Sequence, residues 1–326
     1  MSLAAILLIA LIVATASCAA GPEFGAAQVA TAQVAPDESA SDEPLYASPT
    51  RRDRIGRVMA PVMINGHGPF RFVIDTGATH SVMSSDLAQR LGLAVSAGSG
   101  VVLRGVTGSA VVATVQVEKL RAGDLILRNR MMPIVNAVLP GSDGILGVLG
   151  LQDKMVIVDF ARDRIQILNS RGDISRRGYL RVPVTLGFNS LLLADARVGR
   201  VEVKAIIDTG AQRTLGNEAL REALNITADP HNLPAKIDVQ GVTAEIQAGY
   251  QAIAPTIRLG NMDVARVTIA FGDMHVFEVW ELADVPALLI GMDVLGTLDT
   301  LVIDYARKEV QFKLRPGPVR LRFSTR

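Results

Sequence analysis

Residues 72–78 read Phe72-Val73-Ile74-Asp75-Thr76-Gly77-Ala78, and the same pattern returns as Ala205-Ile206-Ile207-Asp208-Thr209-Gly210-Ala211. In both copies, apolar residues that favour strands lead directly into an acid, a hydroxyl residue, a glycine and an alanine. One acid at the end of a buried strand is unusual, because burying a charge is costly. Two acids in the same local setting suggest that Asp75 and Asp208 meet in the folded chain.

The composition excludes several classes of protein. The chain has 326 residues, enough for two domains or one large one, and 49% of them are hydrophobic. Its net charge of +1 offers no field for nucleic acid. The four histidines lie far apart, so we expect no metal site. Gly144, Gly147 and Gly150 form G-x-x-G-x-x-G, which is not the dinucleotide fingerprint, and we expect no cofactor.

The N-terminus predicts export. Residues 3–14 form an unbroken apolar run, which is short for a membrane span but suits the core of a secretory signal. We predict a signal peptide at residues 1–20 and a periplasmic location. Cys18 is the only cysteine, so no disulfide forms within the chain. Cys18 either carries the lipid of a bacterial lipoprotein, which tethers the protein to a membrane, or is discarded with the leader.

Residues 21–54 are rich in alanine, proline, serine and acids, with little apolar periodicity. This composition predicts a disordered linker. The alternative is a pro-segment that masks the active site.

The rest of the chain is strand-rich and duplicated. Asp75 and Asp208 lie 133 residues apart, and the offset between matching segments drifts upward to 145, as loop insertions would cause. We predict an N-terminal lobe at residues 55–170, a C-terminal lobe at 178–316, and a short helix at 84–91 and at 217–224. The largest insertion gives the second half an extra loop near 272–286. Its Trp280, the only tryptophan, either lines a cleft or anchors the loop.

The order of these motifs resembles the retropepsin and pepsin group of aspartic proteases. The Asp-Thr-Gly-Ala motif, a following hydroxyl and apolar pair (Ser81-Val82 and Thr214-Leu215), and an apolar-apolar-Gly turn occur in each half. The turns are Ile145-Leu146-Gly147 and Leu289-Ile290-Gly291. The resemblance implies an all-β fold of two homologous β-barrel lobes with short helices and one shared cleft. Because one chain supplies both motifs, it resembles a fused dimer that acts as a monomer.

The resemblance also implies roles for residues. Asp75 and Asp208 are the expected catalytic acids, Thr76 and Thr209 are expected to hydrogen-bond across the two loops, and Gly77 and Gly210 let the backbone turn beside each acid. The apolar-apolar-Gly turns are expected to cross under the catalytic loops. Ala78 and Ala211 replace the hydroxyl residues usual in pepsins, so we expect activity at milder pH.

Two glycine-tipped hairpins, at residues 103–111 and 239–246, are the expected substrate-binding flaps. Val106 and Val242 are expected to face apolar side chains of the substrate, although each hairpin has the alternative of an ordinary surface turn. The expected flap residues are Gly105, Val106, Thr107 and Gly108 in the first hairpin, and Gly241, Val242 and Thr243 in the second.

The predicted function is an exported aspartic endopeptidase whose partners are exported or envelope proteins or peptides. The alternative is a catalytically inactive, peptide-binding envelope lipoprotein of the same fold. Asp159 and Asp304, which also repeat, are expected to be structural acids. His80 is expected to be an exposed loop residue, since its counterpart in the second half is Arg213.

Overall fold

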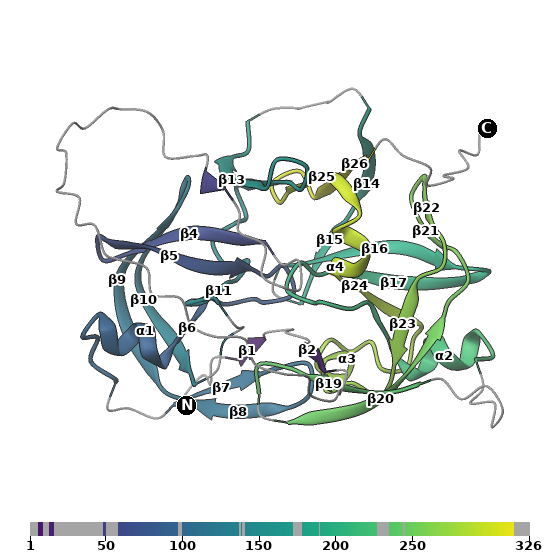
Figure 1. Cartoon of the computed structure of the whole chain (residues 1–326), viewed down its shortest axis with the longest axis horizontal. Helices are drawn as coiled ribbons and strands as arrows, with labels where there is room; N and C mark the ends of the chain where they lie inside the picture. The colour runs from purple at the N-terminus through teal and green to yellow at the C-terminus, as the bar shows by residue number, and fades with distance from the viewer. Residues whose placement is uncertain are drawn as a thin grey trace, which may run out of the picture.

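The computed structural model shows two β-rich lobes side by side, with a sheet shared between them and a pair of hairpins on the opposite side (Figure 1). The structure describes residues 6–8, 13–15, 48–49, 58–96, 100–136, 138, 141–171, 178–188, 190–226, 235–243 and 245–315. Most of the predicted signal peptide, Cys18 and nearly all of segment 21–54 lie outside this part. The predicted all-β, two-lobed fold is confirmed.

The N-terminal lobe is a closed six-stranded barrel. Along its strand β9 the buried residues largely alternate with exposed ones, so one face of the strand packs into the barrel. The predicted helix at 84–91 is confirmed as α1, which Ser84 caps by accepting a hydrogen bond from the Leu87 N–H. The elements of the barrel are β4 (Met59–Ile64), β5 (His67–Ile74), β6 (Val82–Ser84), α1 (Ser85–Arg90), β9 (Thr114–Ala122), β10 (Leu125–Val135) and β11 (Gly144–Leu146).

The C-terminal lobe repeats this arrangement. In both lobes the strand that leads to the acid pairs in parallel with the strand of the apolar-apolar-Gly turn: β5 with β11, and β17 with β24. The predicted helix at 217–224 is confirmed as α2, capped by Asn217. The elements of this lobe are β15 (Thr185–Gly187), β16 (Leu191–Val198), β17 (Val201–Ile207), β18 (Leu215–Gly216), α2 (Glu218–Ala223), β19 (Ala235–Gln240), β20 (Ile246–Ile253), β21 (Ile257–Leu259), β22 (Met262–Val264), β23 (Thr268–Phe271), α3 (His275–Val279), β24 (Ala287–Ile290) and α4 (Met292–Leu295).

The two lobes differ in one long hairpin. Strands β9 and β10 of the first lobe are continuous, and they close its barrel. Their counterparts in the second lobe are split, because β20 pairs with β23 while β21 pairs with β22. Pro255, which has no N–H to donate, lies between β20 and β21, and Arg266 has a positive φ of 62° between β22 and β23. The ten strands of the second lobe therefore form an open sheet, to which β2 (Val13–Thr15) adds an eleventh strand.

The shared sheet joins the halves through their last hairpins. Strand β12 of the first half pairs antiparallel with β25 of the second, with Ile157 opposite Val302. Both side chains are buried in one small apolar cluster on this sheet. The sheet has the order β14 (Leu180–Pro183), β26 (Glu309–Leu314), β25 (Leu298–Asp304), β12 (Lys154–Asp159), β13 (Arg164–Asn169) and β3 (Ser48–Pro49).

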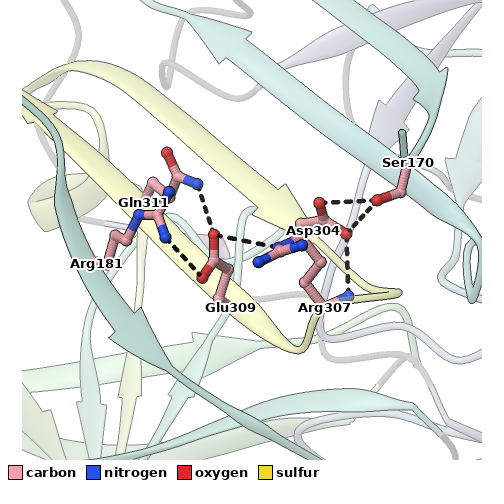
Figure 2. A network of polar contacts seen from close by, with 6 residues as sticks. All are labelled: Ser170, Arg181, Asp304, Arg307, Glu309 and Gln311. Carbon is pink, nitrogen blue, oxygen red and sulfur yellow. Dashed lines mark hydrogen bonds and ion pairs between the residues drawn. The ribbon is translucent and has the colours of Figure 1, made fainter. Parts of the chain in front are cut away.

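A polar network lies along this shared sheet (Figure 2). The Ser170 hydroxyl, which follows β13, lies 2.9 Å from both carboxylate oxygens of Asp304 at the end of β25. The Arg307 N–H donates to the same carboxylate. Asp159, the counterpart of Asp304, accepts hydrogen bonds from the Arg162 backbone and side chain. Both carboxylates are bonded to neighbouring turns, as expected of structural acids.

Candidate active site

The fold places both acids of the duplicated motifs in the interior. Asp75 follows the three buried residues that end β5, and Asp208 follows those that end β17; each acid is 0% exposed. The Asp75 N–H donates to the Leu146 carbonyl (3.1 Å), and the Asp208 N–H donates to the Ile290 carbonyl (3.0 Å). Strands β11 and β24 therefore fix the backbone of each acid in the same way.

The two carboxyl groups lie against each other. The Asp75 carboxyl lies close enough to that of Asp208 to act on its pKa, and each carboxyl lies against the glycine of the opposite loop. A β-carbon added at Gly77 would overlap the Asp208 carboxylate, and one added at Gly210 would overlap that of Asp75. Each glycine also donates its N–H to Oδ1 of the acid in its own loop, at 2.9 Å for Gly77 and 2.8 Å for Gly210. Only a residue without a side chain fits at either position.

Two threonines fix the spacing of the loops through four buried hydrogen bonds. The Thr76 hydroxyl donates to the Ile207 carbonyl (2.6 Å) and accepts the N–H of Thr209 (3.0 Å). The Thr209 hydroxyl donates to the Ile74 carbonyl (2.6 Å) and accepts the N–H of Thr76 (3.3 Å). Each hydroxyl thus bonds the backbone of the opposite loop as both donor and acceptor.

Burial controls the protonation of the pair. It raises the pKa of Asp208 from 3.8 to about 6, although the N–H groups of Gly210 and Ala211 and the carboxyl of Asp75 act in the opposite direction. Ala78 and Ala211 are fully buried beside the acids and offer no hydroxyl donor. Two carboxyls in contact cannot both ionise easily, so the pair holds one proton at mildly acidic pH.

The apolar-apolar-Gly turns pass directly against the catalytic loops. The Gly147 N–H donates to the Ser81 hydroxyl (3.1 Å), and the Gly291 N–H donates to that of Thr214 (3.2 Å). A β-carbon at Gly147 would overlap the His80 backbone, as one at Gly291 would overlap that of Arg213. Turns 145–147 and 289–291 therefore support the two loops from the side of the barrel strands.

The second lobe has a further support that we did not expect from the sequence. Asp293 accepts hydrogen bonds from the Thr214 hydroxyl (2.7 Å) and N–H (3.0 Å), and burial raises its pKa. The sequence contains a signal for this role, because Asp293 lies two residues after Gly291, where the first half has the apolar residue Leu149. Asp293 orients Thr214, which in turn holds the Gly291 turn.

His80 is half-buried, so the expectation of an exposed loop residue is wrong. Burial lowers its pKa, and the charge of Arg130 adds to this effect. The backbone carbonyl of His80 packs against Gly147. His80, Ser81 and Arg130 line a hollow of about 230 Å³ beside the catalytic loop.

The two expected flaps are hairpins whose tips touch. The first consists of β7 (Val101–Arg104) and β8 (Ser109–Val112), and the second of β19 and β20. Figure 1 shows both hairpins on the side of the molecule opposite the shared sheet. The hydroxyls of Thr107 and Thr243 lie 3.2 Å apart, and the Gly241 N–H donates to Thr107 (3.3 Å). Two hydrogen bonds therefore join the tips of the two hairpins.

The tips cross to the opposite lobes. Val106 of the first flap is 0% exposed in an apolar cluster of the C-terminal lobe, so the expectation that it faces the substrate is wrong for this closed arrangement. Val242 of the second flap packs, partly buried, against a cluster of the N-terminal lobe that includes Leu103. Gly105 and Gly108, the other tip residues of the first flap, lie against Thr243 and Glu245 of the second.

Both flap strands accept an added strand at their free edges. Strand β1 (Ile6–Leu8) pairs in parallel with β7, and β2 (Val13–Thr15) pairs antiparallel with β19. Leu7 lies opposite Leu103, and Ala14 lies opposite Val239, which is the equivalent position of the second flap. An approximate two-fold axis relates the two flaps. An extended peptide that passes both flaps therefore runs parallel to the edge strand of one flap and antiparallel to that of the other. The flaps thus present two edges for a single extended peptide.

A family model described as aspartyl protease matches residues 60–152 and 194–294, one segment in each lobe. These segments cover more than half of the chain and include both acids and both apolar-apolar-Gly turns. The protein belongs to the retropepsin-like aspartyl protease family, as its motifs predicted, and membership assigns it to the peptidases, hydrolases that act on peptide substrates. A comparison with curated protein sequences gave no significant match.

Among the residues that the structure describes, no group of three or more His, Cys, Asp or Glu side chains could hold a metal ion. No helix in the same part of the chain has the length and apolar character needed to cross a membrane.

Proposed function

We propose that the protein is an aspartic endopeptidase that hydrolyses peptide bonds with a water molecule activated between Asp75 and Asp208. The observation that carries this proposal is the contact between the carboxyl groups of two duplicated, buried loops. Burial favours a pair that holds one proton, so an acid and a base are available at the same time.

The proposed reaction uses no covalent intermediate. The ionised carboxyl takes a proton from the water molecule while the water oxygen bonds to the peptide carbonyl carbon. At the same time the protonated carboxyl donates its proton to the carbonyl oxygen. The leaving nitrogen of the tetrahedral gem-diol then takes the proton from the carboxyl that received it from water, and the C–N bond breaks. A hydroxyl of the gem-diol gives its proton to the other carboxyl as the new carboxylic acid forms, so the pair returns to its starting state. The N–H groups of Gly77 and Gly210, which donate to Oδ1 of their own acids, hold both carboxyls in position.

The proposed substrate is an extended peptide held under both flaps. The pairing of β1 with β7 and of β2 with β19 supports this mode, since strand addition uses backbone hydrogen bonds and leaves side chains free for selection. Both acids come from one chain, which supports action as a monomer.

The decisive test is cleavage of a fluorogenic peptide library by the wild type and by Asp75→Asn and Asp208→Asn. We expect each substitution to lower kcat/KM by about 10²- to 10⁴-fold, the range for loss of general acid–base catalysis. Asp159→Asn is the matched control, because Asp159 is a repeated acid that bonds only a turn. A statine-type mimic of the tetrahedral intermediate should inhibit the wild type.

Full activity in either dyad variant would overturn the proposal. Peptide binding by the wild type without cleavage would favour the peptide-binding alternative.

We also propose that the protein is exported to the periplasm and acts on exported or envelope proteins. The apolar run at residues 3–14, followed by small residues, supports this location. Mass spectrometry of the mature N-terminus tests it. A free N-terminus near residue 20 would indicate release, and a lipid-modified Cys18 would indicate a membrane tether. An intact Met1 in the mature protein would contradict both outcomes.

A further inference from the structure

The insertion of the C-terminal lobe contacts the flap of the N-terminal lobe. Helix α3 lies within the extra segment 272–286, which the duplication places in the second half alone. The Val276 N–H donates to the carbonyl of Val106 at the flap tip (3.2 Å). His275 Nε2 lies 3.0 Å from the hydroxyl of Ser109 in β8 of the same flap. Two hydrogen bonds therefore join α3 to both sides of the tip.

An apolar contact reinforces these hydrogen bonds. Val106 belongs to the same buried cluster as Met274, Phe277 and Trp280 of the inserted segment, and all four side chains are at most 1% exposed. The rings of Phe277 and Trp280 pack edge to face, with centroids 6.1 Å apart. Trp280 thus anchors the inserted loop, the second of the two roles expected for it, and it does so in the cluster that receives the flap tip.

The helix is itself held from the second flap. The side chain of Gln247 in β20 accepts the His275 N–H (3.2 Å) and donates to the Asp273 carbonyl (3.1 Å). Contacts other than those with the first flap therefore hold α3, and the two flaps are joined through the insertion as well as at their tips.

We propose that α3 and Trp280 form a latch for the flap of the N-terminal lobe, with His275 and Trp280 as positioning residues. The latch makes the two flaps unequal. The first flap closes onto α3 of the C-terminal lobe, whereas the N-terminal lobe has no equivalent insertion for the second flap. It holds the closed flap over bound peptide, and in this respect it rests on the proposed function. The docking itself is a conformational equilibrium that can be measured without catalysis.

Trp280 gives a direct readout, because it is the only tryptophan. Acrylamide quenching of its fluorescence is measured in the full chain carrying Asp75→Asn, so that no cleavage occurs. We expect His275→Ala and Ser109→Ala each to raise the quenching constant about five-fold, the population change expected when one hydrogen bond is lost. The double variant should show no further increase, because both substitutions remove the same bond.

The duplication supplies a matched control. Val106→Ser in the first flap should raise quenching more than His275→Ala does, because it removes the docked side chain. Val242→Ser, at the equivalent position of the second flap, should leave quenching within two-fold of the parent. Should Val106→Ser fail to fold by circular dichroism, the two hydrogen-bond variants alone decide, since Ser109 is exposed and His275 is only half-buried.

Steady-state kinetics in the active background give the second readout. We expect His275→Ala to raise KM about five-fold and to leave kcat within two-fold, because the latch acts on closure and does not touch the acids. Unchanged quenching in both His275→Ala and Ser109→Ala overturns the latch. Absent peptide cleavage in the wild type, with the quenching changes present, would overturn the proposed function and leave the docking intact.

Discussion

The hydroxyl of Thr209 donates a 2.6 Å hydrogen bond to the carbonyl of Ile74, the residue that precedes the acid of the other lobe. The bond joins the two lobes through residues that are 135 positions apart in the chain. Thr76 makes the same bond in return, so the position of each acid depends on the loop of its partner.

We expect Thr76→Val and Thr209→Val each to lower the free energy of unfolding by about 3 kcal/mol, since each leaves a carbonyl and an N–H buried without a partner. Urea denaturation measures the change. Thr185→Val is the control, because the Thr185 hydroxyl makes a surface bond to the Leu193 carbonyl (3.3 Å) and its loss should cost less than about 0.5 kcal/mol. Equal effects at the buried and surface sites would contradict this account.

The glycines beside the acids should tolerate no side chain. Gly77→Ala and Gly210→Ala place a β-carbon on the carboxylate of the opposite loop, so we expect kcat/KM to fall by at least about 100-fold. Peptide cleavage measures the loss. Gly187→Ala is the matched control, since the nearest atom to its added β-carbon lies 3.9 Å away. Near-normal activity in Gly77→Ala would mean that the carboxyls are not held in contact.

The pH profile should follow the raised pKa of Asp208. A carboxyl whose pKa is raised keeps its proton to higher pH, so the singly protonated pair persists up to about pH 6, and kcat/KM should fall above that value. Ala211→Ser adds a hydroxyl that can donate to the ionised carboxylate, and should therefore move this alkaline limb downward by about one pH unit. Ala194→Ser, at another buried alanine, should leave it in place. An optimum near pH 2 to 3 in the wild type would contradict the prediction.

Tyr305→Phe should not destabilise the protein. The Tyr305 hydroxyl is buried, and within the described residues it has no hydrogen-bond partner. Burial and the charges of Asp75 and Asp208 raise its pKa, so it stays neutral. Removing the hydroxyl should raise the free energy of unfolding by about 1 kcal/mol, and Phe160 occupies the equivalent position of the first half. Thermal unfolding measures the difference, and a lower Tm would show that the hydroxyl is bonded in the folded protein.

Much of the site follows from local sequence patterns. The Asp-Thr-Gly-Ala motif, the following hydroxyl residue (Ser81 or Thr214) and the glycine turn recur in the same order in both halves. This repetition predicts that they belong to one site, although each turn lies more than 60 residues from the hydroxyl that it contacts. The duplication then predicts that the two sets meet, because one half of such a site has no partner for its threonine. The same reasoning gave the helices α1 and α2, whose capping residues and first-turn acids are visible in the sequence.

The remaining features depend on contacts between distant segments. Val106 lies at a hairpin tip, and the sequence around it does not reveal whether solvent, substrate or α3 covers its side chain. His80 shares a hollow with Arg130 of the distant strand β10, so the residues next to His80 in the sequence do not reveal its partial burial. The long hairpin of the second lobe is split at Pro255, which the sequence analysis did not single out. The effect of this split on closure of the sheet depends on strands that come from both ends of the lobe.

The pairing of β12 with β25 has a consequence for control of the enzyme. Where two separate chains each supply one acid, dilution disassembles the site, and activity depends on protein concentration. Here a continuous hydrogen-bonded sheet connects the halves. If the protein acts as a monomer, as we propose, its site forms in a unimolecular step when the chain folds, and we expect activity per molecule to be unchanged by dilution.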